Sequence, residues 1–241
     1  MNGEPPSVEK IVERLQKEDN LPDTIHAKQV KQLEYGNGLK ETEVEIWESL
    51  PYQFRSEVIS TKVIQEFDFE ISVINSPVSE FGKSGDIVLQ DRNKIVIYDE
   101  KQNTYKIHPL QSPREQIGHT ITTTLIGSSP LTTFNISYEG VEYVADRKAY
   151  VLRFQPTEMV NSFLENLDYI FIWIDSEYWF PMKREVEYKI KDGEIFNTHE
   201  SVDFQEIDLL QKRKFKQVDI NTELSASIFD FDPPKDAKRI D

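Results

Sequence analysis

The stretch DYIFIWIDSEYWFPMKREVEYKIKDGEIF, residues 168–196, decides how this chain folds. After its first aspartate, the stretch is apolar at six successive positions, and successive side chains of a β-strand point to opposite faces. One face would therefore carry aromatic rings and the other isoleucines: Tyr169, Phe171 and Trp173 against Ile170, Ile172 and Ile174. A strand that is apolar on both faces must be covered on both faces. The stretch predicts a strand inside a larger sheet.

Two turn signals follow within the same stretch. Asp175-Ser176-Glu177 separates the apolar strand from a second alternating run, and Asp192-Gly193 ends that run. Asp-Gly pairs favour the tight turns of β-hairpins, because both central residues of such turns need positive φ angles. We therefore expect antiparallel strands that follow one another along the chain.

The same two-residue period extends over most of the sequence. It runs from about Thr24 to Pro109, and it resumes near Phe134 with turns at Gly140 and Asp146-Arg147. Aromatic residues, which pack well on pleated surfaces, make up 11% of the chain. We predict a mainly β (α+β) fold, a strongly curved antiparallel sheet or incomplete β-barrel of about ten strands with a helical lid.

Three segments show the spacing of amphipathic helices. The first begins after Ser7, an expected N-cap, and carries its apolar stripe from Val8 to Leu15. The second, residues 111–130, has apolar positions four residues apart, but its threonines are poor helix formers, so we expect a marginal helix or a mobile segment there. The third follows Thr157, another expected cap. These helices would cover the concave face of the sheet, the last two of them as a lid.

Composition limits the class of protein. Residues 7–241 show no composition break or repeat, so we expect one domain after an N-terminal tether at residues 1–6. A net charge of −15 argues against nucleic-acid binding, because phosphate recognition needs a basic face. The chain has no cysteine, which excludes disulfides, thiolate catalysis and cysteine metal sites. No apolar run is long enough to span a bilayer.

The sequence offers no residues for catalysis, a cofactor or a metal. No G-x-S-x-G motif or nucleotide-binding fingerprint occurs. Asp230 and Asp232 share one face of an expected strand, but a single pair supplies too few oxygens for calcium. The four histidines lack the spacing of a zinc helix motif: His26, His108, His119 and His199. We therefore predict that the protein is not an enzyme and needs no cofactor.

The sequence FDFDPP, residues 229–234, alternates apolar and acidic side chains near the end of the chain. This pattern predicts a last, half-buried strand of the sheet, with Phe229 and Phe231 towards the core. The two prolines that follow would stop further strand pairing, because proline has no backbone N–H to donate.

Several short motifs recur in a fixed order. A run from Trp173-Ile174-Asp175 through Pro181 and Lys183 leads to the Asp-Gly hairpin. LPYQFRSEV at residues 50–58 and IVIYDEKQNTYKIHPL at residues 95–110 precede it, and an asparagine followed by F-x-F-x-P closes the chain. In order and spacing, these motifs resemble the LolA/LolB/RseB-like lipoprotein-carrier superfamily.

The resemblance implies an incomplete β-barrel with a helical lid and no catalytic residues. Members of that superfamily lie outside the cytoplasmic membrane, where they bind acyl chains of lipoproteins, other amphipathic lipids or partner proteins. Similar proteins of Gram-positive, often spore-forming bacteria are lipoprotein-sorting-like, and some act in sporulation or germination. Many are lipid-anchored, so the resemblance implies an extracytoplasmic protein held on the outer face of the cell membrane by an N-terminal lipid anchor.

One position departs from the pattern of the superfamily. The periplasmic carriers place an arginine just before the proline of the P-x-x-F segment, where it latches the lid. Here that position is Leu50, and Arg55 corresponds to a different position of the superfamily. The departure argues against a latch-and-release cycle of the carrier type.

The first function that these observations favour is the binding of a hydrophobic ligand, a lipid or a lipoprotein acyl chain, by a carrier or sensor. Ile170 and Ile172 are an alternative lining to the aromatic row, and the packing of a closed core is the other interpretation of both sets. The expected cavity and lid residues are Tyr169, Phe171, Trp173, Ile117, Ile121, Leu125 and Phe163.

The second function is that of a protein-interaction scaffold. The curved sheet would hold a partner protein of the cell envelope on an edge or on its convex face, and so regulate it. The acidic surface suits a basic partner, and the missing latch arginine removes one feature of the carriers.

Overall fold

The computed structural model describes residues 5–16, 22–35, 38–49, 52–64, 82–110, 129–157, 166–190 and 207–240. These parts contain twelve strands: β1 (Thr24–Tyr35), β2 (Gly38–Ser49), β3 (Gln53–Val63), β4 (Ile87–Gln90), β5 (Lys94–Asp99), β6 (Thr104–Pro109), β7 (Phe134–Val144), β8 (Arg147–Pro156), β9 (Leu167–Asp175), β10 (Pro181–Ile190), β11 (Ile207–Ile220) and β12 (Lys238–Arg239).

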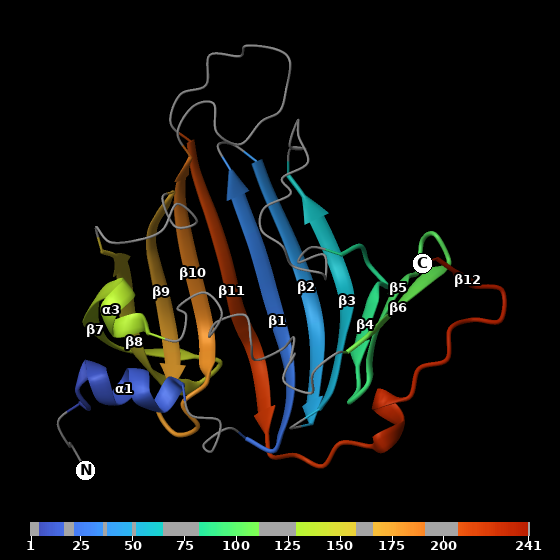
Figure 1. Cartoon of the computed structure of the whole chain (residues 1–241), viewed down its shortest axis with the longest axis horizontal. Helices are drawn as coiled ribbons and strands as arrows, with labels where there is room; N and C mark the ends of the chain where they lie inside the picture. The colour runs from blue at the N-terminus through green and yellow to red at the C-terminus, as the bar shows by residue number, and fades with distance from the viewer. Residues whose placement is uncertain are drawn as a thin grey trace.

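All twelve strands belong to one sheet, in the order β12-β6-β5-β4-β3-β2-β1-β11-β10-β9-β8-β7 (Figure 1). Neighbouring strands are antiparallel except β12, which pairs with β6 in parallel. Since β7 and β12 are the two edges, the sheet is curved but open. The predicted fold class is confirmed, with twelve strands in place of about ten.

The sheet bends sharply on its β7 side. Cα atoms of β7 come within 8 Å of β11, although three strands separate the two in the sheet. The register shifts between Tyr138 and Gly140 and again between Pro181 and Lys183. Such bulges add a residue to one strand and bend it. Gly140 has a φ of 122°, a conformation that a residue without a Cβ adopts at little cost.

Within the described ranges, three short helical segments accompany the sheet: α1 (Val8–Leu15), α3 (Pro130–Thr133) and the 3₁₀ helix η3 (Ala226–Phe229). The predicted cap of α1 is confirmed, because Ser7 Oγ accepts a hydrogen bond of 3.3 Å from the backbone N–H of Lys10. No helix in the described part of the chain is long and apolar enough to cross a membrane. The second and third predicted helices, and the Asp192-Gly193 turn, lie outside the described residues.

A first core cluster lies between α1 and the strands nearest to β7. We call the sheet face against which α1 packs the helix face, and the opposite one the outer face. The predicted covering of β9 on both faces is confirmed, because its isoleucines and Trp173 are all buried. The cluster consists of Ile11, Val12, Leu15, Leu33, Phe134, Leu152, Phe154, Leu167, Ile170, Ile172, Ile174, Val186, Tyr188 and Leu209.

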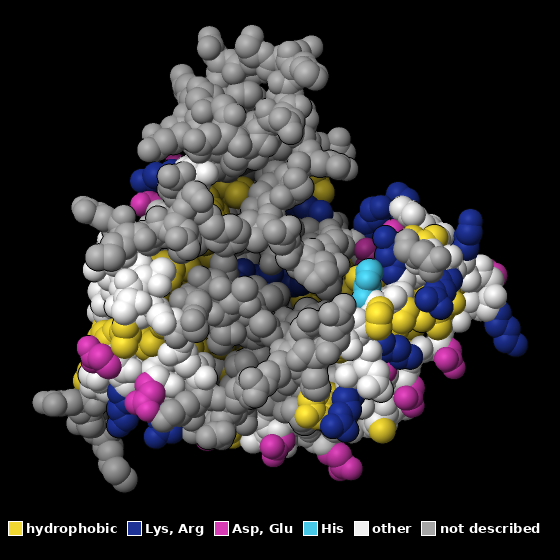
Figure 2. All heavy atoms as spheres, in the orientation of Figure 1, with side chains coloured by type: hydrophobic (Ala, Val, Ile, Leu, Met, Phe, Trp, Pro, Cys, Tyr) yellow, Lys and Arg dark blue, Asp and Glu magenta, His cyan; other side chains and the backbone are white. Residues whose placement is uncertain are grey.

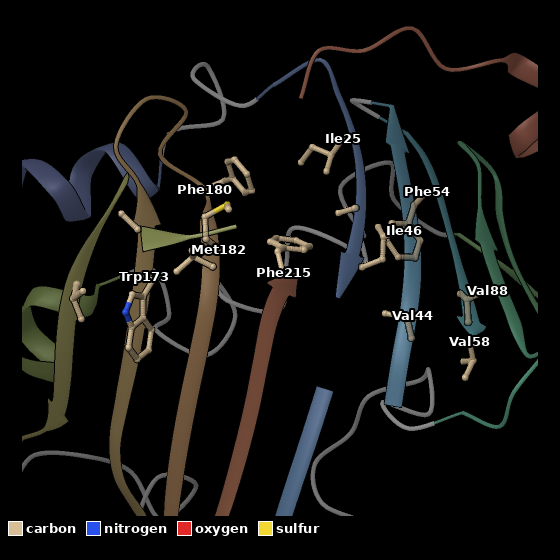
Figure 3. Close-up of a cluster of buried hydrophobic side chains, with 14 of the residues drawn as sticks. Ile25, Val44, Ile46, Phe54, Val58, Val88, Trp173, Phe180, Met182 and Phe215 are labelled. Atoms are coloured by element: carbon tan, nitrogen blue, oxygen red, sulfur yellow. The ribbon is translucent and has the colours of Figure 1, made fainter. Parts of the chain in front are cut away.

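A second core cluster extends across the rest of the sheet (Figure 3). One part comes from β1–β5 and β11: Ile25, Ala27, Val44, Ile46, Phe54, Val58, Val88, Ile95 and Phe215. The other part comes from β7, β8 and the β9–β10 hairpin: Val144, Ala149, Val151, Trp173, Phe180 and Met182. The two parts meet where β10 stops pairing with β11, and there the ring centroids of Phe180 and Phe215 lie 6.2 Å apart.

The predicted last strand at residues 229–234 is wrong. The chain forms η3 and then an irregular segment before it reaches β12 at Lys238–Arg239. After β11, in the middle of the sheet, the chain crosses β3 on its way to β6, where it forms β12, so residues 229–234 do not lie beside an unpaired strand (Figure 1). The side-chain pattern is nevertheless kept, because Phe229 is buried, Phe231 packs against Tyr98, and both aspartates are exposed.

Candidate functional site

The predicted cavity residues on β9 lie on opposite faces of the sheet. Tyr169, Phe171 and Trp173 share the outer face, whereas Ile170 and Ile172 pack with α1 on the helix face. The sequence left these two linings as alternatives. The predicted lid residues lie outside the described parts of the chain: Ile117, Ile121, Leu125 and Phe163.

Charged side chains surround the aromatic row of the outer face. Lys183 Nζ lies 3.6 Å from the centroid of the Trp173 ring, and Trp173 Nε1 donates a hydrogen bond of 2.7 Å to Glu142. The guanidinium carbon of Arg153 lies 5.5 Å from the centroid of the Tyr169 ring. Cations over aromatic faces are attracted by the ring quadrupole. This mixed aromatic and charged surface suits an acyl chain less well than the apolar helix face does.

Asp175, the acid of the Trp-Ile-Asp motif, closes the β9–β10 hairpin. Its side chain is 1% exposed, and it accepts a hydrogen bond of 2.7 Å from Arg147 Nε. It also accepts hydrogen bonds from the backbone N–H groups of Glu177 and Tyr178, at 2.9 and 2.7 Å. Charge-assisted bonds of this kind are strong and hold one geometry. The motif residue therefore has a structural role, which is to fix the turn.

Arg55 holds the C-terminal segment on the outer face. Its Nη1 donates a hydrogen bond of 3.0 Å to the backbone oxygen of Ile228, and its Nη2 lies 3.0 Å from Glu57 Oε2. Its guanidinium also lies over the Trp47 ring, 5.7 Å from the centroid. Leu50, the position of the latch arginine in the carriers, lies outside the described residues.

A row of polar side chains crosses the helix face. Arg184 of β10 is paired with Ile172 on one side and with Arg213 of β11 on the other. Lys31 of β1 is paired with Arg213 and, on its other side, with Thr42 of β2. Directly paired residues point to the same face, and neighbouring strands lie about 4.8 Å apart. The four polar residues therefore form one lateral line, which we call the basic row.

Arg184 and Thr42 of the basic row carry buried polar atoms that have no partner in the described part of the chain. The Arg184 side chain is 4% exposed and that of Thr42 is fully buried. Arg184 Nε and Nη1 and Thr42 Oγ1 have no hydrogen-bond partner among the described residues. Buried polar groups without a partner are rare in folded proteins, and an uncompensated buried charge costs several kcal/mol, on the order of 3–5 when a partner is removed.

Burial perturbs the three cations of the basic row. It lowers the pKa of Lys31 to about 7, with a further contribution from the positive charges of Arg213 and Arg184. It also lowers the pKa of Arg184 and of Arg213, in each case to about 10. Lys31 therefore titrates near neutral pH, whereas both arginines stay charged there. Basic side chains lie beside hydrophobic ones near the centre of the view in Figure 2.

Glu48 is a second buried ionisable group of the helix face. It lies near the end of β2, where it is paired with Ile25 and Phe54, and it is 9% exposed. Burial raises its pKa to about 7. Six residues of β2 separate it from Thr42, which corresponds to about 20 Å along a strand. Glu48 is therefore not the counter-ion of the basic row.

Sequence reasoning missed the basic row. The signal is a charged residue at an inward-pointing position: Arg184 shares the two-residue spacing of the buried Val186 and Tyr188, and Lys31 that of the buried Leu33. Each strand taken alone shows only an isolated exception to its apolar pattern. The row arises because β10, β11, β1 and β2 are neighbours in this register. In the described residues, no group of three or more His, Asp or Glu side chains could hold a metal ion.

No protein-family model and no curated protein sequence matches the chain. Solved structures do match. An uncharacterized conserved protein from Thermus thermophilus aligns with a TM-score of 0.52 and 13% identity, over 98% of this chain and 99% of its own. MucB aligns with a TM-score of 0.50 and 13% identity, over 93% of this chain and 62% of its own. The Pseudomonas aeruginosa MucA/MucB complex gives the same TM-score and identity, over 92% and 60%.

The chain has a LolA/LolB/RseB-like fold. The resemblance found in the sequence motifs is thereby confirmed at the level of the fold. The chain spans less than two thirds of the length of MucB, so the likeness to MucB concerns one part of that protein. The Gram-positive sporulation or germination setting stays a prediction.

Proposed function

We propose that this LolA-like chain is a non-catalytic, extracytoplasmic carrier or sensor that binds a lipid or the acyl chain of a lipoprotein. The observation that carries the proposal is the apolar helix face of β1–β5. Neither α1 nor α3 belongs to the core cluster on this part of the sheet. The apolar side chains there are Ile25, Ala27, Val44, Ile46, Phe54, Val58, Val88 and Ile95.

Such a surface suits an aliphatic chain. Burial of apolar area contributes about 25 cal/mol per Å², or about 0.8 kcal/mol for each methylene group. A ligand pocket is usually a mostly apolar concavity with a few polar groups that orient the ligand. The curved sheet supplies the apolar lining. The ligand would take the place of side chains that now cover this lining.

We place the cover of this surface in the predicted lid, with Ile117, Ile121, Leu125 and Phe163 towards the sheet. For the lining, we prefer the helix face, which Ile170 and Ile172 share; these two pack against α1, so the part of this face open to a ligand is that of β1–β5. The alternative row, Tyr169, Phe171 and Trp173, has charged neighbours that an acyl chain would have to displace. Attachment to the outer face of the cell membrane through an N-terminal lipid anchor belongs to the same proposal.

Native mass spectrometry of the purified chain, followed by denaturing extraction, tests the proposal. We expect a co-purifying mass that extracts as fatty acid or phospholipid, and uptake of added lipid by protein that has been stripped of it. Phe163→Asp should abolish uptake without loss of the fold. Ser162→Asp, next to Phe163 but off the apolar stripe, is the matched control. A protein that neither co-purifies with lipid nor takes it up would refute the carrier function.

The edge strand β7 favours a second function, a scaffold for a cell-envelope protein. Val141 and Tyr143 of this strand are large apolar side chains that are 42% and 70% exposed. Because β7 is an edge of the sheet in the described part of the chain, it has backbone groups that pair with no further strand there. An extended segment of a partner can add to such an edge as a further strand. MucB, which shares this fold, has been solved in complex with MucA.

A pull-down from an envelope extract, washed at low and at high salt, tests the scaffold function. We expect a protein partner that high salt releases, because the surface of the chain is acidic. Tyr143→Lys should weaken the capture, and Tyr105→Lys, on β6 near the other edge of the sheet, should not. Recovery of lipid alone, without a salt-sensitive protein, would contradict this function.

A further inference from the structure

The basic row differs from the charged groups of the outer face. On the outer face, Lys212 Nζ lies 2.8 Å from Glu34 and Lys183 Nζ lies 2.8 Å from Glu185. Arg153 of that face lies over aromatic rings instead, and its Nε has no hydrogen-bond partner among the described residues. On the helix face, no Asp or Glu occupies a position at which β10 pairs with β11 or β11 pairs with β1, as far as these strands are described. A chain with a net charge of −15 therefore places three cations side by side on its helix face, and one of them, Arg184, has two buried nitrogens without a partner among the described residues.

Each residue of the row also has an apolar side chain next to it. Two residues away from each polar residue, on the same face and strand, stands a buried apolar side chain: Val186 for Arg184, Phe215 for Arg213, Leu33 for Lys31 and Val44 for Thr42. Leu33 and Val186 belong to the first core cluster, and Phe215 and Val44 to the second. On their other side, Arg213, Lys31 and Thr42 have the polar neighbours Gln211, Gln29 and Lys40, so the row lies where polar and apolar side chains of the helix face meet. A ligand that fits it has a charged group joined to a hydrocarbon chain.

We propose that the basic row binds the anionic headgroup of an amphiphilic lipid, a carboxylate or a phosphate, whose hydrocarbon chain lies on the apolar helix face of β1–β5. This inference rests on the proposed carrier function and names its ligand class. Guanidinium groups pair well with carboxylates and phosphates, and a bond between two charged groups is about twice as strong as a neutral one. The unpartnered Nε and Nη1 of Arg184 and the Thr42 hydroxyl are the donors that such a headgroup would satisfy.

The lysine of the row gives the inference a second consequence. Empty, the row holds Lys31 with a pKa of about 7, and the described charged groups that act on it are Arg213 and Arg184, both cationic. An anion placed among the three would favour the charged form of the lysine. Binding of an anionic lipid at pH 8 is therefore expected to take up a proton, which calorimetry in buffers of different ionisation enthalpy measures.

Competition between lipids of one chain length tests the inference. The full chain, stripped of lipid, is loaded with fluorescent cis-parinaric acid, and three competitors displace it: oleate, 1-oleoyl-lysophosphatidate and the uncharged monoolein. We expect the two anionic competitors to bind at least about tenfold more tightly than monoolein. The order of oleate and lysophosphatidate tells whether a carboxylate or a phosphate is the preferred headgroup.

Arg184→Met keeps the volume of the side chain and removes its charge, a change that folded proteins often tolerate at buried sites. We expect it to weaken binding of oleate and lysophosphatidate about tenfold, and to leave monoolein binding unchanged. Lys183→Met, the adjacent residue on the outer face, is the matched control and should alter neither. Circular dichroism and the melting temperature of each variant report whether the fold is intact.

The outcomes separate the two proposals. If oleate and monoolein bind equally, or if Arg184→Met weakens both to the same extent in a folded protein, the headgroup site is overturned and the carrier function stands. If no competitor binds and parinaric acid is not taken up, the carrier function itself fails. Preferential binding of both anions, lost in Arg184→Met alone, supports the basic row as the headgroup site.

Discussion

Replacing Glu48 by glutamine should make the protein more stable at pH 8 and leave its stability unchanged at pH 4. The carboxyl group is 9% exposed on the helix face, among apolar neighbours that include the paired Ile25 and Phe54. Burial raises its pKa from 4.5 to about 7, because the charged form loses its hydration. Glutamine has the shape of the neutral carboxyl group and carries no charge at any pH.

The sign and size of the effect follow from the two pKa values. Below pH 4.5, Glu48 is protonated in both the folded and the unfolded chain, so it contributes no pH dependence. As the pH rises from 4.5 to 7, the unfolded chain releases the proton while the folded chain keeps it, and folding loses stability. A difference of about 2.5 pKa units corresponds to about 3 kcal/mol in the free energy of unfolding. Above pH 7 this loss is complete and constant.

Urea denaturation of lipid-free protein at pH 4, 6 and 8, followed by circular dichroism, measures the effect. We expect the free energy of unfolding of Glu48→Gln to exceed that of the parent by about 3 kcal/mol at pH 8, by about 2 kcal/mol at pH 6, and by almost nothing at pH 4. Glu41→Gln, on the outer face of the same strand, is measured alongside as the control for the loss of a carboxylate from β2. A difference that is constant with pH, or that favours the parent at pH 8, would refute the assignment of Glu48 as a neutral buried acid.

Three further predictions concern other parts of the chain. Between pH 7 and pH 10 the unfolded chain keeps a proton that the folded Lys31 has lost, so the parent protein gains stability over this range. Lys31→Met should remove this gain, and urea denaturation at both pH values measures it. Asp175→Ala should lower the free energy of unfolding by about 3 kcal/mol, since it removes the buried acceptor of Arg147 Nε and of two backbone N–H groups and leaves Arg147 only its exposed bond to Glu177. Glu177→Ala, at a side chain that is 66% exposed, should cost less than about 1 kcal/mol, and thermal unfolding compares the two. Phe229→Ala should cost about 3 kcal/mol and speed amide exchange in residues 221–240, and unchanged exchange there would show that this segment is held by other contacts.

Local patterns carried the fold class. The period-two alternation, the turns near residues 146 and 176, and the capped stripe of α1 are short-range signals, because each depends on residues that are neighbours in the chain. The C-terminal FDFDPP stretch shows where such signals fail. Its alternation correctly separates buried Phe229 from exposed Asp230, but the path of the chain across the sheet prevents strand pairing. Alternation indicates which side chains face a surface, and it does not require a strand.

The sequence alone determined that this protein has a mainly β sheet, that β9 is covered on both faces, and that its motifs resemble the LolA/LolB/RseB-like group. Only the tertiary structure decided the strand order, the face on which each set of β9 side chains lies relative to α1, and the meeting of Arg184, Arg213, Lys31 and Thr42 in one row. The physical reason is distance along the chain. Alternation follows from the geometry of a single strand, whereas the basic row depends on hydrogen-bond registers between strands that lie far apart in sequence.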